Sequence, residues 1–216
     1  MIDVTRAADR YRGGEPAAGI ETRHAFSFGG HYDPANVRFG LLLACNEERL
    51  APGAGFAAHP HRDTEIVTWV VTGELTHTDS AGHASVVRPG EVQWLGAGAG
   101  VRHVERNAGP EPLTFLQMWL HPGEFGGEPR YAVRRADRFT PPGQPLATLH
   151  VGRAPGPLPA APFVYVHVVR GQVRLGEQVL AAGDAARITA DAGLRAETNG
   201  PAEYLVWEMH GEPSYG

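Results

Sequence analysis

Two short segments of this sequence carry side chains whose types and spacing could bind a metal ion. One is His59-Pro60-His61, and the other is His103-Val104-Glu105, which follows a glycine-rich turn. Side chains alternate between the two faces of a β-strand, so the first and last residues of each segment share a face. If two such strands face each other across a barrel, three imidazoles and one carboxylate meet at a single point.

This set of donors is typical of a site for one first-row divalent metal. Imidazole and carboxylate suit iron(II), nickel, copper, cobalt, manganese or zinc, and four protein ligands on a six-coordinate ion leave two positions for a substrate or water. A histidine must be neutral to bind a metal, so the sequence predicts metal loss below about pH 5–6. Glu65 shares the parity of His59 and His61, and it could be a fifth ligand or a hydrogen-bonding partner.

The other histidines lack this spacing, and we expect ordinary polar or hydrogen-bonding roles for His24, His31, His77 and His83. In the second half of the chain no histidine has another histidine two residues away, which predicts a metal-free region around His150, His167 and His210. We expect several large side chains to lie mostly in the core, with one or two lining an apolar cavity beside the metal: Trp69, Trp94, Phe115, Met118 and Trp119.

Composition narrows the class of protein. The chain has 216 residues, enough for one substantial core or two small ones. Cys45 is the only cysteine, so an internal disulfide is impossible and a cysteine-based zinc site is not expected. The net charge of -5 argues against direct nucleic-acid binding. A local basic cluster is expected to be solvated or paired with Glu128 and Asp137: Arg130, Arg134, Arg135 and Arg138.

Nothing in the sequence indicates a membrane span or a secretory signal. No stretch approaches about 18 consecutive apolar residues, and the first residues have neither a basic nor an apolar leader region. We therefore expect a cytoplasmic location.

The pattern along the chain predicts an all-β fold. Short runs of β-branched and aromatic residues alternate with glycine and proline turns, as in an antiparallel sandwich or barrel. The segments 72–74 and 170–172, each centred on a glycine, are predicted hairpin corners. The expected strands are Arg38 to Ala44, Glu65 to Val71, Val92 to Leu95, Leu113 to Leu120, Phe163 to Val169, Gln172 to Leu175 and Tyr204 to Met209.

A proline-rich break predicts two domains. Thr140-Pro141-Pro142-Gly143-Gln144-Pro145 cannot continue a strand, so we divide the chain into residues 1–139 and 140–216. Residues 70–91 and 168–185 share the same order of strands and glycine turns, which suggests duplication of one barrel unit. The C-terminal barrel is smaller and could borrow strands from the first. Two barrels can cover each other's sheets, so a monomer is expected.

Four stretches of the sequence resemble the pirin family of the cupin superfamily. They are Arg23 to Pro34, Gly55 to Gly82, Gly98 to Asn107 and Phe115 to Arg135, together most of the first 138 residues. Over the C-terminal part the resemblance is looser and confined to the strand pattern. Gly98 stands where cupins usually have proline, a departure that pirin-like sequences tolerate.

The resemblance implies two cupin barrels packed face to face, of which only the N-terminal one holds a metal. It implies His59, His61, His103 and Glu105 as the ligands, which favours Glu105 over Glu65, and iron(II) as the usual metal. Several bacterial relatives are similar to flavonol (quercetin) 2,3-dioxygenases. Other members resemble non-catalytic regulators of transcription factors or metabolic enzymes.

Two functions from different classes follow. The first is a dioxygenase in which the metal activates a small aromatic, flavonol-like substrate for attack by dioxygen, with Glu105 as general base. The second is a redox-sensitive binding module that regulates a protein partner, with the basic cluster facing that partner. A cupin isomerase or sugar-binding protein is a weaker third hypothesis, because such sites do not need a glutamate in this register.

Overall fold

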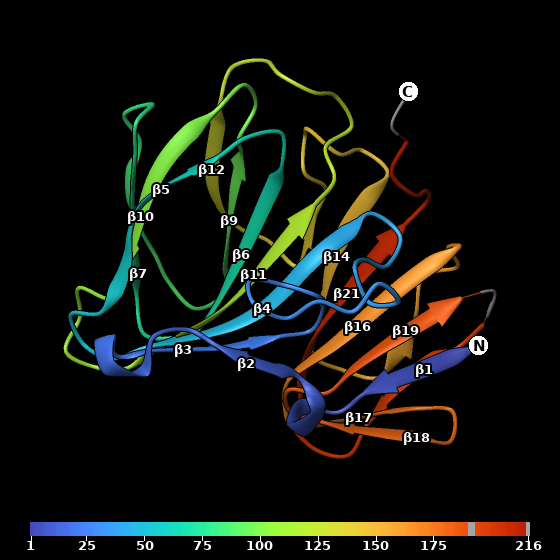
Figure 1. The fold of residues 1–216 in the computed structure, drawn as a ribbon. Helices are drawn as coiled ribbons and strands as arrows, with labels where there is room; N and C mark the ends of the chain where they lie inside the picture. Colours follow the sequence, from blue (N-terminus) through green and yellow to red (C-terminus); the bar gives the residue numbers. More distant parts are fainter. Residues whose placement is uncertain (190–192, 215–216) are drawn as a thin grey trace.

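The computed structural model describes residues 1–189 and 193–214, and almost all regular structure in them is β-strand (Figure 1). Four antiparallel sheets form two units, each with one large sheet and one four-stranded sheet. Two three-residue 3-10 helices, Ala7–Asp9 and Pro16–Ala18, lie near the N-terminus. In the described part of the chain no helix is long and apolar enough to cross a membrane. The all-β prediction is confirmed.

The N-terminal unit contains a seven-stranded sheet and a four-stranded sheet. The order of the larger sheet is β12 (Arg130–Arg135), β9 (Glu91–Gly96), β6 (Glu65–Thr72), β11 (Leu113–Leu120), β4 (Leu42–Leu50), β3 (Ile20–His24) and β2 (Tyr11–Gly13). The order of the smaller sheet is β5 (Gly55–His61), β10 (Val101–Arg106), β7 (Leu75–Asp79) and β8 (Ala84–Val87). Both predicted metal-binding segments therefore lie on adjacent strands of the smaller sheet.

The C-terminal unit repeats this plan with a six-stranded and a four-stranded sheet. The larger has the order β1 (Ile2–Thr5), β19 (Ala185–Thr189), β16 (Phe163–Arg170), β21 (Glu203–Met209), β14 (Ala147–Gly152) and β13 (Arg138–Phe139). The smaller has the order β15 (Gly156–Pro157), β20 (Arg195–Thr198), β17 (Gln172–Leu175) and β18 (Gln178–Ala181). Strand β1, near the N-terminus, thus pairs with β19 in the sheet of the C-terminal unit. The division of the chain between residues 139 and 140 remains a prediction.

The predicted hairpin corners at Gly73 and Gly171 are wrong in one respect. Neither glycine joins two paired strands; each carries the chain from a large sheet to the small sheet of the same unit, from β6 to β7 and from β16 to β17. Both adopt positive φ, 76° and 72°, and a Cβ on either would lie within 3.0 Å of backbone atoms. Glycine is therefore required at the same corner of both units.

The two large sheets pack face to face across a shared apolar core. Trp69 and Met118 from the first unit and Tyr165 and Trp207 from the second are buried in one cluster. The Nε1 of Trp207 lies 3.1 Å from the Sδ of Met118, which joins the two units directly. The predicted core positions of Trp69, Trp94, Phe115 and Met118 are confirmed, whereas Trp119 is only partly buried.

Candidate metal centre

Strand β10 supplies two of the four predicted ligands. Its burial alternates strictly, with Val101, His103 and Glu105 buried and Arg102 and Arg106 exposed. The alternation follows from the pleat of a strand that has one face toward the barrel interior and one toward solvent. His103 and Glu105 consequently point into the same barrel, as the spacing predicts.

Strand β5 supplies the other two predicted ligands from the neighbouring position in the same sheet. His103 is directly paired with His59, and Val101 with His61. The two strands were expected to face each other across the barrel, but they are hydrogen-bonded neighbours. A β-bulge between His103 and Glu105 shifts the register of the pair, and such bulges redirect side chains next to functional sites.

The three imidazoles form a compact triangle. Their ring centroids are 4.4 Å apart for His59 and His103, 4.7 Å for His61 and His103, and 4.9 Å for His59 and His61. Each offers a ring nitrogen within 4.8 Å of those of the other two. The Nδ1 of His59 lies 2.8 Å from the carbonyl oxygen of Ala57. A hydrogen bond donated there makes Nε2 the nitrogen with the lone pair, and this atom lies 2.9 Å from the Nε2 of His103, at the centre of the triangle.

Glu105 lies beside this triangle and is fully buried. Its Oε2 accepts a 2.7 Å hydrogen bond from the Nε2 of Gln117 and lies 3.9 Å from the Nε2 of His103. The ligand atoms of Glu105, His77 and His103 lie within 4.8 Å of one another, and this second group does not include His59 or His61. The structure therefore brings three of the predicted ligands together and sets the fourth next to one of them.

The electrostatics of the centre favour neutral imidazoles. Burial, followed by the neighbouring imidazoles, lowers the pKa of both His61 and His103 to about 3. Burial raises the pKa of Glu105, and the hydrogen bond from Gln117 opposes that rise. His61 and His103 are thus in the form that binds a metal at neutral pH.

Two buried atoms without hydrogen-bond partners support a fit to a cation. The Nε2 of His61 and the Oε1 of Glu105 are both buried and have no partner in the described part of the chain. Buried polar atoms are nearly always satisfied, so a pair of orphans beside two further imidazoles indicates a missing partner. A divalent metal satisfies both a lone pair and a carboxylate, and the donor set present here could hold one.

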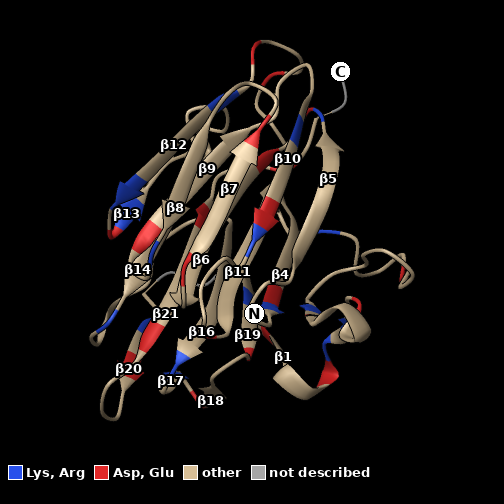
Figure 2. Cartoon of the chain, turned by 90° about the vertical axis from the view of Figure 1, so that its left-hand side faces the viewer, with Lys and Arg blue, Asp and Glu red and all other residues tan. Residues whose placement is uncertain are grey.

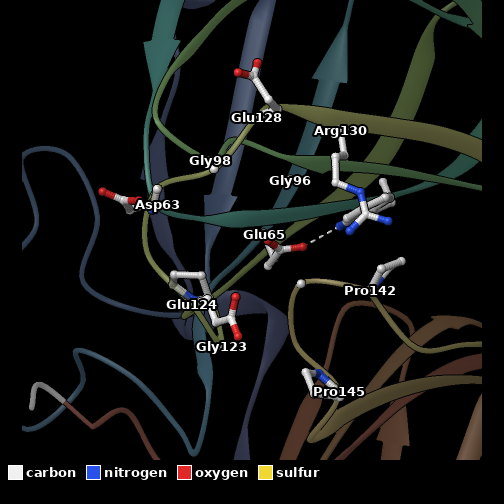
Figure 3. A pocket seen from close by; sticks show the side chains of 15 residues that line it. Asp63, Glu65, Gly96, Gly98, Gly123, Glu124, Glu128, Arg130, Pro142 and Pro145 are labelled. Atoms are coloured by element: carbon white, nitrogen blue, oxygen red, sulfur yellow. Dashed lines mark hydrogen bonds between the residues drawn. The ribbon is translucent and has the colours of Figure 1, made fainter.

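Glu65 does not belong to this centre. The chain turns between β5 and β6, with Asp63 at a φ of 49°, so the strand parity that relates Glu65 to His59 and His61 is broken. Glu65 instead accepts a 2.5 Å hydrogen bond from the Nε1 of Trp94. Figure 3 shows it in a separate cavity, near Arg130 and Pro142. Neither group of potential metal ligands includes it.

An apolar cavity of about 360 Å³ opens beside the histidines, within the range of small-molecule sites. As predicted, Trp119 lines it, with its ring centroid 4.9 Å from that of His61. Six further lining residues were not predicted from the sequence; they come from β4, β5, β11 and the segment after β3: Phe28, Asn46, Glu48, Phe56, Ala57 and Gln117.

Glu48 is a buried carboxyl group in the metal cavity that was not predicted from the sequence. It is buried in the wall of this cavity and accepts a hydrogen bond from the Thr22 hydroxyl. Burial raises its pKa to about 7, and the Glu105 carboxylate contributes to the rise. The cavity therefore holds a second carboxyl group that changes its charge near neutral pH. Glu48 lies in the polar run Asn46 to Arg49, beyond the expected strand that ended at Ala44, so no sequence pattern pointed to it.

The remaining histidines mostly have the predicted hydrogen-bonding roles. His24 bonds Asn46, His83 bonds Asp79, and both His150 and His210 bond Glu208. His77 also bonds Asp79, at 3.2 Å, but it is fully buried and its ring lies 5.3 Å from that of His103.

The basic cluster on β12 and β13 lies at one side of the molecule (Figure 2). Arg130 stacks over Trp94 at 5.4 Å, and Arg135 lies 3.9 Å from Glu91. All four arginines of the cluster are exposed, as the solvated alternative predicts, and Asp137 bonds Arg153 at 2.5 Å instead of one of them.

Two antiparallel units with a histidine-lined barrel in the first define a bicupin. The chain belongs to the pirin family: residues 5–120 match that family, and residues 157–209 match the quercetinase C-terminal cupin domain.

The similar proteins cover between 63% and 99% of this chain. A relative in Mycobacterium tuberculosis, named for a provisionally assigned quercetin 2,3-dioxygenase activity, is 43% identical and covers 97% of this chain and 95% of its own. An Escherichia coli K12 protein named quercetin 2,3-dioxygenase is 40% identical over 138 residues, 63% of this chain and 59% of its own. The bacterial pirin YhhW from E. coli, solved in complex with nickel(II), has a TM-score of 0.88 at 27% identity, covering 99% of this chain and 100% of its own.

Proposed function

We propose that this protein is a metal-dependent dioxygenase acting on flavonol-like aromatic substrates. His59, His61, His103 and Glu105 are the proposed ligands of one divalent metal, with iron(II) as the first candidate. The observation that carries the proposal is the triangle of imidazoles beside a buried carboxylate at the wall of an apolar cavity. The names of the similar proteins support the reaction and the aromatic substrate.

A bound divalent metal supplies Lewis-acid activation of a phenolic or enolic hydroxyl at an open coordination position. Dioxygen is the oxidant in the proposed reaction, and both of its atoms enter the product. The residues of the chain hold the metal and orient the groups around it. The histidines hold the ion in their neutral form, and Gln117 fixes the orientation of the Glu105 carboxylate through a 2.7 Å hydrogen bond.

The cavity is suited to a flat aromatic substrate. Phe28, Phe56 and Trp119 offer ring surfaces around it, and the ring centroids of Phe28 and Trp119 lie 5.0 Å apart in a T-shaped contact. Glu105 is the proposed acceptor of the hydroxyl proton. Glu48 is a second acceptor in the same cavity, able to hydrogen-bond another hydroxyl of a polyphenol.

Oxygen uptake with quercetin tests this proposal. Metal-loaded protein is expected to consume oxygen, metal-stripped protein is not, and His61→Ala is expected to abolish uptake. His83→Ala is the matched control, because His83 is partly exposed and hydrogen-bonded to Asp79, outside the imidazole triangle. Uptake that persists in His61→Ala would remove the enzyme proposal.

A second candidate is a redox-sensitive, metal-binding regulator of a transcription factor or metabolic enzyme. The observation in its favour is that Arg134 and Arg138 are exposed on β12 and β13, and in residues 1–189 and 193–214 neither guanidinium makes an ion pair. These arginines could face an acidic partner. Metal-loaded protein with no oxygen uptake, but with a partner whose capture is lost in Arg134→Gln, supports this function instead.

A further inference from the structure

A second cleft, between the two units, carries an unbalanced positive charge. It encloses about 440 Å³, and its walls include Arg10, Arg12, Arg23 and Glu47 from the first unit and His167 and Val169 from the second. None of the residues that line the metal cavity lines this cleft. Three guanidinium groups therefore face one carboxylate at a place that the proposed reaction does not use.

The two outer arginines oppose each other directly. Arg12 on β2 is paired with Arg23 on β3, and like charges at opposed positions of an antiparallel pair repel. Within the described residues, neither guanidinium makes a hydrogen bond or an ion pair. Glu47 on β4 is directly paired with Arg23 on β3, and it is the one acidic residue among those lining the cleft. An anion seated between the two arginines would remove the repulsion.

The inner part of the cleft contains buried nitrogens without partners. Arg10 and His167 are 3% and 1% exposed. Arg10 donates from Nη2 to the carbonyl oxygen of Cys45 at 2.7 Å, but its Nε and Nη1 have no hydrogen bond, and neither ring nitrogen of His167 has one. The nearest oxygen of Glu47 lies 3.7 Å from Nη1, beyond hydrogen-bond distance. Four orphaned nitrogens in one place indicate a missing partner.

We propose that this cleft is a binding site for a small organic anion, whose oxyanion group pairs with Arg12 and Arg23. The planar fork of arginine matches both carboxylate and phosphate oxygens. Arg10 lines the buried inner part of the cleft and offers the anion its positive charge and the two donors, Nε and Nη1, that have no partner. Burial, and the charge of Arg10, keep the pKa of His167 well below its usual value, so that imidazole offers hydrogen bonds without charge.

The apolar residues of the cleft indicate what carries the anionic group of the ligand. Val71, Leu116 and Val169 give the cleft an apolar side, so the anionic group is carried on a short carbon skeleton. Because both units contribute walls, a bound anion contacts both, and it is expected to raise the unfolding temperature of the whole chain.

Calorimetric titration of the metal-loaded protein at low salt tests the site, with inorganic phosphate and succinate as separate probes. We expect saturable binding of at least one probe, weakened at least tenfold in Arg12→Gln/Arg23→Gln. The matched control is Arg134→Gln/Arg138→Gln, which removes the same charge from exposed positions elsewhere. Unchanged metal content in both double variants shows that each is folded.

The probe that binds identifies the chemistry. Phosphate alone indicates a phosphate ester, succinate alone a carboxylic acid, and both together an oxyanion site without further selection. Failure of both probes to saturate would overturn the proposal. Equal losses in the two double variants would overturn it as well, because the effect would then be one of net charge. The proposed dioxygenase activity plays no part in either outcome.

Discussion

His59 and His103 occupy directly paired positions on β5 and β10, and their Nε2 atoms are 2.9 Å apart. Two ring nitrogens that would each lie about 2.1 Å from one ion are themselves separated by roughly 3.0–3.4 Å, depending on the angle between them. The strand pairing therefore sets these nitrogens at a ligand-to-ligand separation by itself. The carbonyl of Ala57 fixes the ring of His59, so little reorganisation is needed to bind a metal.

Glu105 and Glu65 should differ in their effect on metal affinity when each carboxylate is replaced by an amide. Glu105→Gln is expected to lower metal affinity at least tenfold, because an amide replaces a buried carboxylate beside the histidines. Glu65→Gln is expected to leave metal content unchanged, since Glu65 bonds Trp94 in another cavity. Elemental analysis after competition with a chelator measures both. Equal losses in the two variants would contradict the assignment of Glu105.

The hydrogen bond from Gln117 should matter for metal affinity. Gln117→Leu removes the donor to the Glu105 Oε2, so the carboxylate loses its orienting partner inside the barrel. Loss of such a partner typically costs 10- to 100-fold in metal affinity, and we expect a loss of about that size. Gln178→Leu, at an exposed position on β18, is the control. Metal affinity in Gln117→Leu equal to that of the control would show that the hydrogen bond has no such role.

The protein should keep its metal at a lower pH than the ordinary pKa of histidine predicts. The pKa of His61 and His103 is lowered to about 3, so protons compete for these nitrogens only in strong acid. The expected midpoint of metal loss is therefore below pH 5, lower than the pH 5–6 predicted from the sequence. Equilibrium dialysis from pH 7 to pH 3.5, with circular dichroism to follow folding, measures it. A midpoint at pH 5.5 or above would contradict the depressed pKa values.

Glu48 should make the metal-free protein less stable as pH rises. Its pKa is raised from 4.5 to about 7 on folding, so its contribution is fully present below pH 4.5 and is lost as pH rises through 7. Glu48→Gln lacks this titration. From pH 5 to pH 8 its free energy of unfolding should gain on the order of 2 kcal/mol relative to the unsubstituted chain. Denaturant unfolding at both pH values measures the difference, and a constant difference would refute the raised pKa.

The positions of strands, and the face on which each side chain lies, were predictable because both depend on residues close together in the sequence. Leu113–Leu120 and Gln172–Leu175 are strands over the predicted residues, and His103 and Glu105 share a face as their spacing requires. Strand alternation repeats every two residues and needs no knowledge of distant chain. The same argument failed at Glu65, where the turn at Asp63 intervenes between two strands of different sheets.

The sequence by itself determined the types of metal ligand, the β-strands that carry them and the likeness to pirins. Only the tertiary structure decided that β5 and β10 are neighbours, that Glu48 and Gln117 join the cavity, and that Arg10 and His167 meet between the units. The physical reason is that residue spacing fixes the direction of a side chain along its own strand. Strand pairing and sheet packing join residues far apart in the chain, and no short-range pattern encodes them.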